Sequence, residues 1–296
     1  MNGFGINLSF AVKRWPEPEV WAAFVREELG LDLVQFSFDL LDPWWPDEIG
    51  TPLARRCREA AAANGLTIHS AFVGLAAYSY NALLHPEAAG REAARLWFRR
   101  AIDRAAEMGA ASVGGPVGGM SVQEAEAPDV RRARYDESLS TLSDLAEYAA
   151  ERGLESLLIE PTPLPREVPW TPVEARELLA DLGTTAVPVR YCLDVGHALY
   201  QPLYGDEARL EPWFDALGER VEMVHLQQTD GLGDSHWGFT RDGIVQPAQV
   251  ARLARSSGVR GPLVLEVFYP FELGDSEVAA DVVASVEYCK EQLARA

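Results

Sequence analysis

Five residues that can bind a metal ion or move a proton lie in or beside short apolar segments. They are Glu160 in LLIEPTP, Asp194 and His197 in YCLDVGH, His225 in MVHLQQTD and Glu266 in LVLEVFY. A carboxylate in an apolar segment is unfavourable to bury unless a partner charge or a metal ion compensates it. Two Glu, one Asp and one His offer oxygen and nitrogen ligands, which suit Mn²⁺, Mg²⁺, Co²⁺ or Zn²⁺ and lack the thiolates typical of structural zinc. The sequence therefore predicts a divalent metal site.

Each of these residues also has an ordinary structural explanation. A glutamate near a strand end can form a salt bridge, a single histidine such as His225 can be a hydrogen-bonded core residue, and Asp194 can cap the next helix. Ligand-type residues at corresponding positions of four successive strands rarely arise by chance, so the joint pattern favours the metal site.

The elements that must position these residues repeat down the chain. A short apolar segment rich in β-branched or aromatic residues is followed by a longer amphipathic segment, eight times in succession. The predicted strands are residues 3–10, 31–39, 66–73, 111–117, 154–161, 189–197, 221–230 and 262–269. The predicted helices are residues 18–29, 47–64, 87–108, 129–152, 171–182, 211–217, 247–256 and 276–294. Glycines that follow predicted helices, such as Gly109 and Gly153, fit helix ends.

Eight such units of about 37 residues favour an α/β fold, a (β/α)8 TIM barrel, in a single domain over residues 1–296. A doubly wound open sheet is the alternative, but the turn INLSFAVKRWP after the first strand lacks its glycine-rich phosphate loop. Active sites of such barrels lie at the carboxyl ends of the strands. The third strand, which we expect to end near His69, adds that residue to the candidates.

Composition excludes several classes of protein. The 296 residues are 48% hydrophobic and carry a formal net charge of −19, which disfavours nucleic acid and anionic lipid surfaces as partners. Three widely spaced cysteines indicate a reducing compartment rather than a disulfide framework. No signal peptide and no segment long enough to span a membrane is evident, so we expect a soluble cytoplasmic protein.

At these residues the sequence resembles the xylose isomerase-like TIM-barrel superfamily, which contains sugar isomerases, ketose 3-epimerases and endonuclease IV-type AP endonucleases. The resemblance covers nearly the whole chain, and its most specific parts are Glu160–Pro161, the DxxH motif from Asp194 to His197, His225 and Glu266. It implies that Glu160, Asp194, His225 and Glu266 bind one divalent ion, with Mn²⁺ as the first choice. It also implies that Glu160 and Glu266 are the acid/base pair and that His197 contacts the substrate.

The match is softer elsewhere. Arg166 and Glu167 resemble an Arg and a Glu that bind substrate in the epimerases, but they are shifted by one residue. The epimerases usually carry an Arg six residues after the strand-seven histidine, where this chain has Gly231. Asp234 and His236 instead resemble endonuclease IV residues that bind further zinc, as does His69. The strand-four histidine of that family is missing, so we treat Asp234 and His236 as substrate-binding or auxiliary-metal candidates, and His69 as a substrate-binding candidate.

The resemblance implies an isomerase or epimerase of a small ketose or ketose phosphate. Two glutamates would transfer a proton through a metal-stabilised cis-enediolate. A metal-dependent hydrolase of the AP endonuclease type, a lyase or decarboxylase acting on a sugar-acid derivative, and a binding protein that retains the barrel are the alternatives. The expected partner is a sugar or sugar phosphate, and the superfamily implies a homodimer or homotetramer. Residue identity does not separate epimerisation from aldose–ketose isomerisation.

Overall fold

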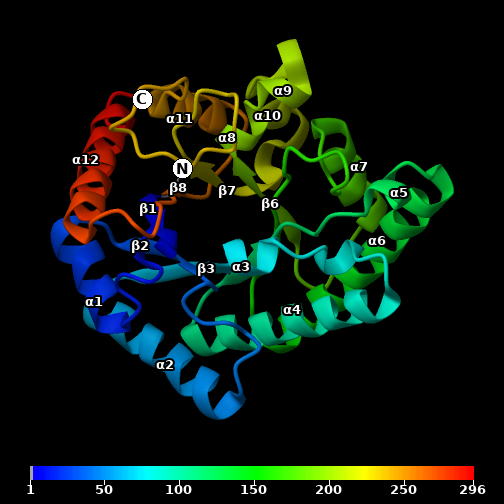
Figure 1. Ribbon diagram of the computed structural model, residues 1–296, viewed down its shortest axis with the longest axis horizontal. Helices are drawn as coiled ribbons and strands as arrows, with labels where there is room; N and C mark the ends of the chain where they lie inside the picture. The colour runs from blue at the N-terminus through cyan, green and yellow to red at the C-terminus, as the bar shows by residue number, and fades with distance from the viewer. Residues whose placement is uncertain (1–2) are drawn as a thin grey trace.

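The computed structural model describes residues 3–296, and its eight parallel strands close into a barrel in chain order. Strand β1 pairs with both β2 and β8, which closes the ring. Figure 1 shows the helices around the strands in the same order, from α1 in blue to α12 in red. The predicted (β/α)8 barrel is confirmed. The strands are β1 Phe4–Asn7, β2 Leu33–Ser37, β3 Thr67–Phe72, β4 Ser112–Gly115, β5 Ser156–Ile159, β6 Val189–Asp194, β7 Val221–Leu226 and β8 Leu263–Leu265.

Eight helices correspond to the predicted ones, and four further short helices lie in the loops. The eight are α1 Pro18–Ala23, α2 Asp47–Ala63, α4 Ala88–Met108, α6 Pro128–Glu151, α7 Pro172–Leu182, α10 Glu211–Leu217, α11 Pro247–Ser256 and α12 Asp275–Leu293. The short ones are α3 Leu75–Tyr78, α5 Val122–Ala125, α8 Val195–Ala198 and α9 Gln201–Tyr204. The segment after α1, Phe24–Glu28, is a π-helical turn. The predicted glycine ends are confirmed at Gly109 and Gly153, whose φ angles of 75° and 80° suit glycine.

The inside of the barrel is filled by a compact apolar layer. Its buried members are Phe72, Leu158, Cys192, Met223 and Val264, with Leu33 packed against them. A second and much larger core lies between the strands and the surrounding helices. The barrel is therefore closed by side chains beneath its rim, as expected for this architecture.

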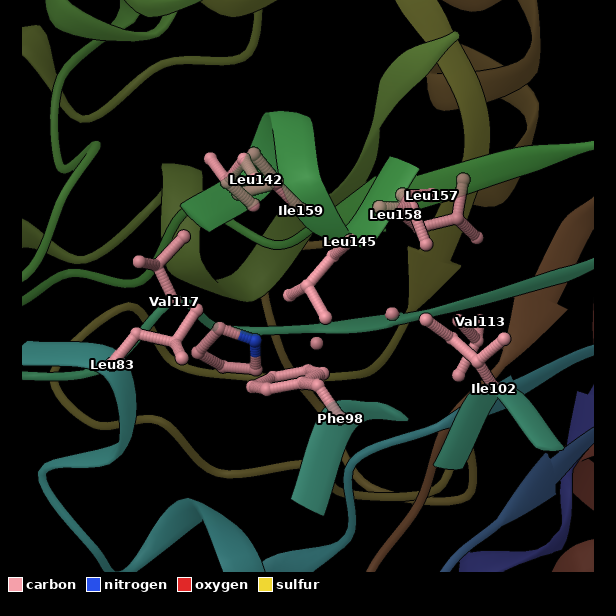
Figure 2. Close-up of a pocket in the computed structure, with 13 residues that line it drawn as sticks. Leu83, Phe98, Ile102, Val113, Val117, Leu142, Leu145, Leu157, Leu158 and Ile159 are labelled. Atoms are coloured by element: carbon pink, nitrogen blue, oxygen red, sulfur yellow. The ribbon is translucent and has the colours of Figure 1, made fainter. Parts of the chain in front are cut away.

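A small apolar cavity is lined by residues of strands and helices and by none of the predicted ligands. Figure 2 shows Phe98 and Ile102 of α4, Val113 of β4 and Leu145 of α6 around it. Its volume of about 20 Å³ is room for about one water molecule. A sugar does not fit there, so this cavity is not the substrate site.

Two expectations drawn from the composition concern the cysteines and the helices. Cys57, Cys192 and Cys289 are free and buried. Within residues 3–296, none of the helices combines the length and the apolar character that crossing a bilayer requires.

Candidate metal centre and active site

Side-chain alternation along the strands builds the site directly above the apolar layer. Successive residues of a strand point to opposite sides, so residues two apart share a side. Leu158, Cys192, Met223 and Val264 face the barrel interior. The residues two positions further along the same stretches of chain are Glu160, Asp194, His225 and Glu266. The four predicted ligands thus form one inward-facing layer at the carboxyl end of the barrel.

Strand pairing fixes the level of these four residues along the barrel axis. Asp194 and His225 are paired neighbours on β6 and β7. Glu160 follows β5, and its backbone N–H donates to the carbonyl of Gly115 on β4 at 3.2 Å. The N–H of Glu266, which follows β8, donates to the carbonyl of Leu226 at 2.8 Å. The ligand layer is therefore attached to the sheet rather than to free loops.

Three carboxylates converge on one ring nitrogen of His225. His225 Nδ1 lies 3.0 Å from Glu160 Oε1, 2.9 Å from Glu266 Oε2 and 4.0 Å from Asp194 Oδ2. Two ligand atoms about 2.1 Å from one octahedral ion and at right angles to each other would be about 3.0 Å apart. The separations fit a shared divalent ion, and a single proton on Nδ1 could not satisfy all three carboxylates.

Asp194 supplies a direct sign that a cation belongs here. Its Oδ1 accepts from the His197 N–H and from Gln227 Nε2, both at 2.9 Å, so it caps helix α8. Its Oδ2, fully buried, has no hydrogen-bond partner among the residues described. An unpaired buried carboxylate oxygen is strongly unfavourable. The helix-cap and ligand explanations for Asp194 therefore both hold, one for each oxygen.

Their surroundings shift the pKa values of the two glutamates in opposite directions. Burial raises the pKa of Glu160, and the attraction of His225 only partly offsets it. Burial also acts on Glu266, but the charge and hydrogen bond of His225 outweigh it and lower the pKa of Glu266. Burial lowers the pKa of His225, but the charge of Glu266 and the hydrogen bond with Glu160 outweigh it, so the pKa of His225 is raised. Two carboxyl groups with opposite shifts are typical of acid/base sites.

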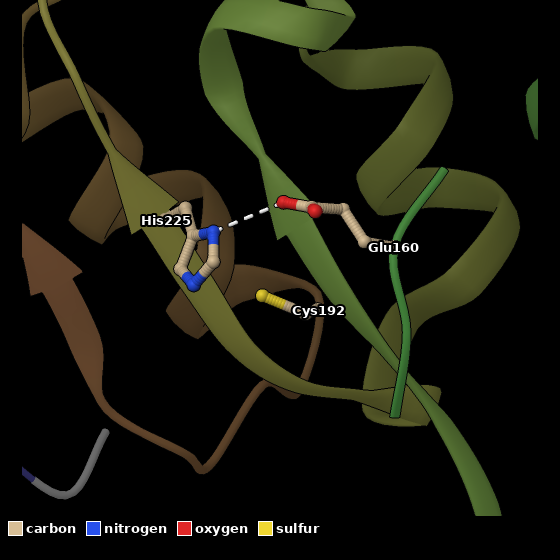
Figure 3. A group of neighbouring side chains, drawn as sticks. All are labelled: Glu160, Cys192 and His225. Atoms are coloured by element: carbon tan, nitrogen blue, oxygen red, sulfur yellow. Dashed lines mark hydrogen bonds and ion pairs between the residues drawn. The ribbon is translucent and has the colours of Figure 1, made fainter. Parts of the chain in front are cut away.

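A thiol lies under the same site. Figure 3 shows Cys192 beneath the contact between Glu160 and His225, and these three side chains could themselves hold an ion. Burial raises the pKa of Cys192 to about 12, so the thiol stays protonated at neutral pH. The full set of Glu160, Asp194, His225 and Glu266 also lies within binding distance of one point. Its ligands are the ones that hard divalent ions prefer.

A second cluster of acid and imidazole groups adjoins the first. Asp234 Oδ2 lies 3.3 Å from His197 Nε2, and its Oδ1 lies 3.0 Å from His236 Nε2. Burial lowers the pKa of His236, but the Asp234 carboxylate outweighs this effect and raises it to about 9. His236 Nδ1 has no hydrogen-bond partner within residues 3–296 and lies 3.5 Å from Glu266 Oε2. Asp194, His197 and His236 could together hold an ion. The structure therefore joins Asp234, His236 and His197 to the site.

The segment after Glu160 places Glu167 and Arg166 differently. Glu167 is buried and accepts from Thr162 Oγ1 at 2.5 Å. Burial raises its pKa, and Tyr78, His197 and Glu160 are close enough to affect it. Arg166 Nη1 instead donates to the carbonyl of Met120 at 3.2 Å. Of this pair, the structure brings Glu167 to the site and directs Arg166 to the loop after β4.

His69 lies below the rim. The expectation that the third strand ends near His69 is wrong, because β3 continues to Phe72, about 10 Å further along. His69 is the extra residue of a bulge, since Val34 pairs with Ile68 and Gln35 with Ser70. Its Nδ1 lies 3.3 Å from Ser70 Oγ. The structure does not bring His69 to the predicted ligands.

Three buried amides in the site were not among the predicted residues. Gln227 Nε2 contacts both Asp194 and Asp234, at 2.9 and 3.1 Å. Gln35 Oε1 lies 2.7 Å from His225 Nε2, and Asn7 Nδ2 donates to Glu266 Oε1 at 2.9 Å. Asn7 and Gln35 each interrupt an apolar strand segment with an uncharged polar residue, and that signal could have identified them. Gln227 follows β7 in the polar stretch Gln227–Asp230 and carries no such signal.

The comparisons with known proteins agree with this geometry. A family model described as xylose isomerase-like TIM barrel matches residues 25–292. Over 294 residues the chain is 24% identical to D-erythrulose 1-phosphate 3-epimerase from Brucella abortus, covering 96% of this chain and 94% of the relative.

Solved structures give the same result. A crystal structure from Rhodospirillum rubrum, named as a candidate xylose isomerase, has a TM-score of 0.95 and 41% identity, with 98% of each chain covered. D-psicose 3-epimerase from Clostridium cellulolyticum, solved with D-tagatose, has a TM-score of 0.75 and 14% identity. That comparison covers 98% of this chain and 99% of the other, and at this identity it shows the fold alone.

Proposed function

This chain is an enzyme of the xylose isomerase-like TIM-barrel family, and on that premise we propose that it is a divalent-metal-dependent isomerase or epimerase of a small ketose or ketose phosphate. The observation that carries the proposal is the convergence of Glu160, Asp194 and Glu266 on His225 Nδ1. An unpaired buried oxygen of Asp194 at the same point supports a cation there.

The residues that would hold the ion are Glu160, Asp194, His225 and Glu266, and we propose Mn²⁺ for it. Mg²⁺, Co²⁺ and Zn²⁺ suit the same ligands. When bound, a divalent ion supplies positive charge that stabilises the enediolate left when a proton leaves the carbon beside a carbonyl group.

The protein's own groups would move the proton. Glu160, which follows β5, and Glu266, which follows β8, lie 3.0 and 2.9 Å from His225 Nδ1, so both carboxylates would reach the same substrate. One would take the proton from carbon and the other would return one. Return to the same carbon from the other side gives an epimer, whereas return to the neighbouring carbon gives an aldose–ketose isomer.

We propose that the second cluster orients the substrate. His197, Asp234 and His236 adjoin the ligand layer, and burial together with the nearby charge of Glu160 raises the pKa of Glu167. These groups can donate to and accept from sugar hydroxyls, which are both donors and acceptors. Because the Brucella relative is an epimerase of D-erythrulose 1-phosphate, a short ketose phosphate is the first substrate to test. The three free cysteines support a cytoplasmic location.

The test is proton NMR in D₂O with a panel of tetruloses, pentuloses, hexuloses and their phosphates. We expect the Mn²⁺-loaded protein to remove the signal of one carbon-bound hydrogen next to the carbonyl of at least one ketose and to form its epimer or isomer. Nicking of abasic DNA without exchange on any ketose would overturn the proposal in favour of the hydrolase.

A further inference from the structure

A chain of hydrogen bonds crosses the ligand layer between three buried side chains. Asn7 lies at the end of β1, Gln35 in β2 and His225 in β7. Asn7 Nδ2 lies 2.5 Å from Gln35 Oε1, and the same oxygen lies 2.7 Å from His225 Nε2. An amide donates only through its NH₂ group and accepts only through its oxygen. The direction of each hydrogen bond in the chain therefore shows which atom carries the hydrogen.

The backbone fixes the orientation of Asn7. The N–H of Ser9 donates to Asn7 Oδ1 at 2.8 Å, and a backbone N–H can only donate. The other end of the Asn7 side chain is therefore its NH₂ group, which has two hydrogens. One is directed to Gln35 Oε1 and the other to Glu266 Oε1, at 2.5 and 2.9 Å. Both donors of Asn7 are thereby used.

The orientation of Gln35 follows from that of Asn7. The atom that receives the Asn7 hydrogen must be the oxygen, so Gln35 Nε2 lies at the opposite end, 3.2 Å from both Ser70 Oγ and Met223 Sδ. His225 Nε2 then faces an oxygen that cannot donate. The hydrogen of that contact must belong to His225 Nε2.

We propose that Asn7 and Gln35 are positioning residues that reserve Nδ1 of His225 for the divalent ion. The proposal rests on the proposed function. A neutral imidazole has one N–H and one lone pair, so a proton held on Nε2 leaves the lone pair on Nδ1. Nδ1 is the nitrogen that faces Glu160 and Glu266.

The second hydrogen of Asn7 extends the same control to a carboxylate. It occupies Glu266 Oε1, so Glu266 Oε2 is the oxygen left to face His225. Without the Gln35 acceptor, the proton of His225 can move to Nδ1 and form a hydrogen bond with Glu160 or Glu266, which competes with an ion. Loss of the group that accepts from a metal-binding histidine typically weakens metal affinity about 10- to 100-fold.

Three substitutions test the role. Gln35→Met is nearly isosteric and removes the acceptor, whereas Gln35→Glu keeps an acceptor for His225 Nε2. Asn7→Asp keeps the oxygen that caps Ser9 but removes both donors. Ser112→Ala is the matched control, because Ser112 is equally buried in the barrel and pairs with Ser156 rather than with the site.

The first measurement is Mn²⁺ affinity of the full chain, followed by the electron paramagnetic resonance signal of free Mn²⁺. We expect about 10- to 100-fold weaker binding in Gln35→Met and Asn7→Asp, and binding within a few-fold of wild type in Gln35→Glu and Ser112→Ala. Equal affinity of wild type and Gln35→Met overturns the positioning role. Wild-type protein that binds no Mn²⁺ overturns the proposed metal instead, so the two failures are distinguishable.

The second measurement determines which ring nitrogen of His225 carries the hydrogen. The chain has only five histidines, so ¹⁵N-histidine NMR resolves them individually, with His225→Gln used for assignment. In the Zn²⁺-loaded and metal-free wild type we expect the His225 Nε2 hydrogen to be observed and slow to exchange, as it also should be in Gln35→Glu. Its loss is expected in Gln35→Met. A wild-type spectrum with the hydrogen on Nδ1 and a lone pair on Nε2 would contradict the proposal even if a variant failed to fold.

Discussion

Glu160 and Glu266 have the same side chain but meet different surroundings at His225. Replacing either by Gln keeps the size of the side chain and removes its ability to exchange a proton. We expect Glu160→Gln and Glu266→Gln to lower turnover by at least about 10²- to 10⁴-fold, the usual contribution of a general acid or base. Circular dichroism should show both variants folded. Glu277→Gln, at an exposed position in α12, is the control, and near-normal turnover of either site variant would exclude the two-glutamate mechanism.

Asp234 and His236 lie beside the ligand layer but outside the set that converges on His225 Nδ1. We expect Asp234→Ala and His236→Ala to reduce kcat/KM by at least about 10-fold while the content of the tight ion stays near wild type. Kinetics and elemental analysis of the same preparations measure both. If either variant instead loses a second stoichiometric ion, the cluster is an auxiliary metal site and the hydrolase alternative gains support.

Charged residues of the site could be predicted from the sequence, but the amides that orient them could not. A carboxylate in LLIEPTP or LVLEVFY stands out because burial of its charge needs a reason. Gln35 in LVQFS draws less attention, since an uncharged amide needs only hydrogen-bond partners, and those come from residues 28 and 190 positions away. The structure brings together all four predicted ligands. The prediction that the third strand ends near His69 was wrong, because His69 lies in a bulge within β3 and three further residues of the strand follow it.

At the scale of elements, the alternation of strands and helices was predictable and the strand ends were not. The predicted strand 189–197 ends at Asp194, where that residue caps α8. Residues beyond the strand end remain buried because they pack over the barrel, so hydrophobicity does not mark the end. Helices such as α3 and α5 have four residues each, too few to show helical periodicity.

Close packing of β4 against β5 positions Glu160, and Gly114 permits it. A Cβ at Gly114 would overlap the carbonyl of Leu158, so Gly114→Ala must push the strands apart. We expect it to lower the free energy of unfolding by about 1–3 kcal/mol and to weaken Mn²⁺ binding, because Glu160 hydrogen-bonds to the next residue of β4.

The matched control for this strand contact is Gly153→Ala. Gly153 ends α6 with positive φ and has open space around it, so its substitution should cost about 1–2 kcal/mol and leave Mn²⁺ affinity unchanged. Thermal denaturation and Mn²⁺ titration compare the two variants. Equal Mn²⁺ affinity in both would show that the strand contact does not position Glu160.

At the scale of the whole molecule, the oligomeric state stays a prediction from the family resemblance. We expect light scattering after size exclusion to give two or four times the chain mass of 32.5 kDa. The net charge of −19 repels copies from one another at long range, so the measurement belongs at physiological salt, where charges are screened beyond about 8 Å. A mass of one chain at micromolar concentration would contradict the prediction.

We propose that the barrel brings Glu160, Asp194, His225 and Glu266 around one ion that makes a carbon-bound hydrogen of a ketose removable. The most direct test follows deuterium uptake by the best ketose before EDTA treatment, after it, and after addition of Mn²⁺, with metal content measured in each sample. We expect about one ion per chain, loss of exchange when the ion is removed, and recovery of exchange with Mn²⁺. Exchange at the original rate by metal-free protein would contradict it.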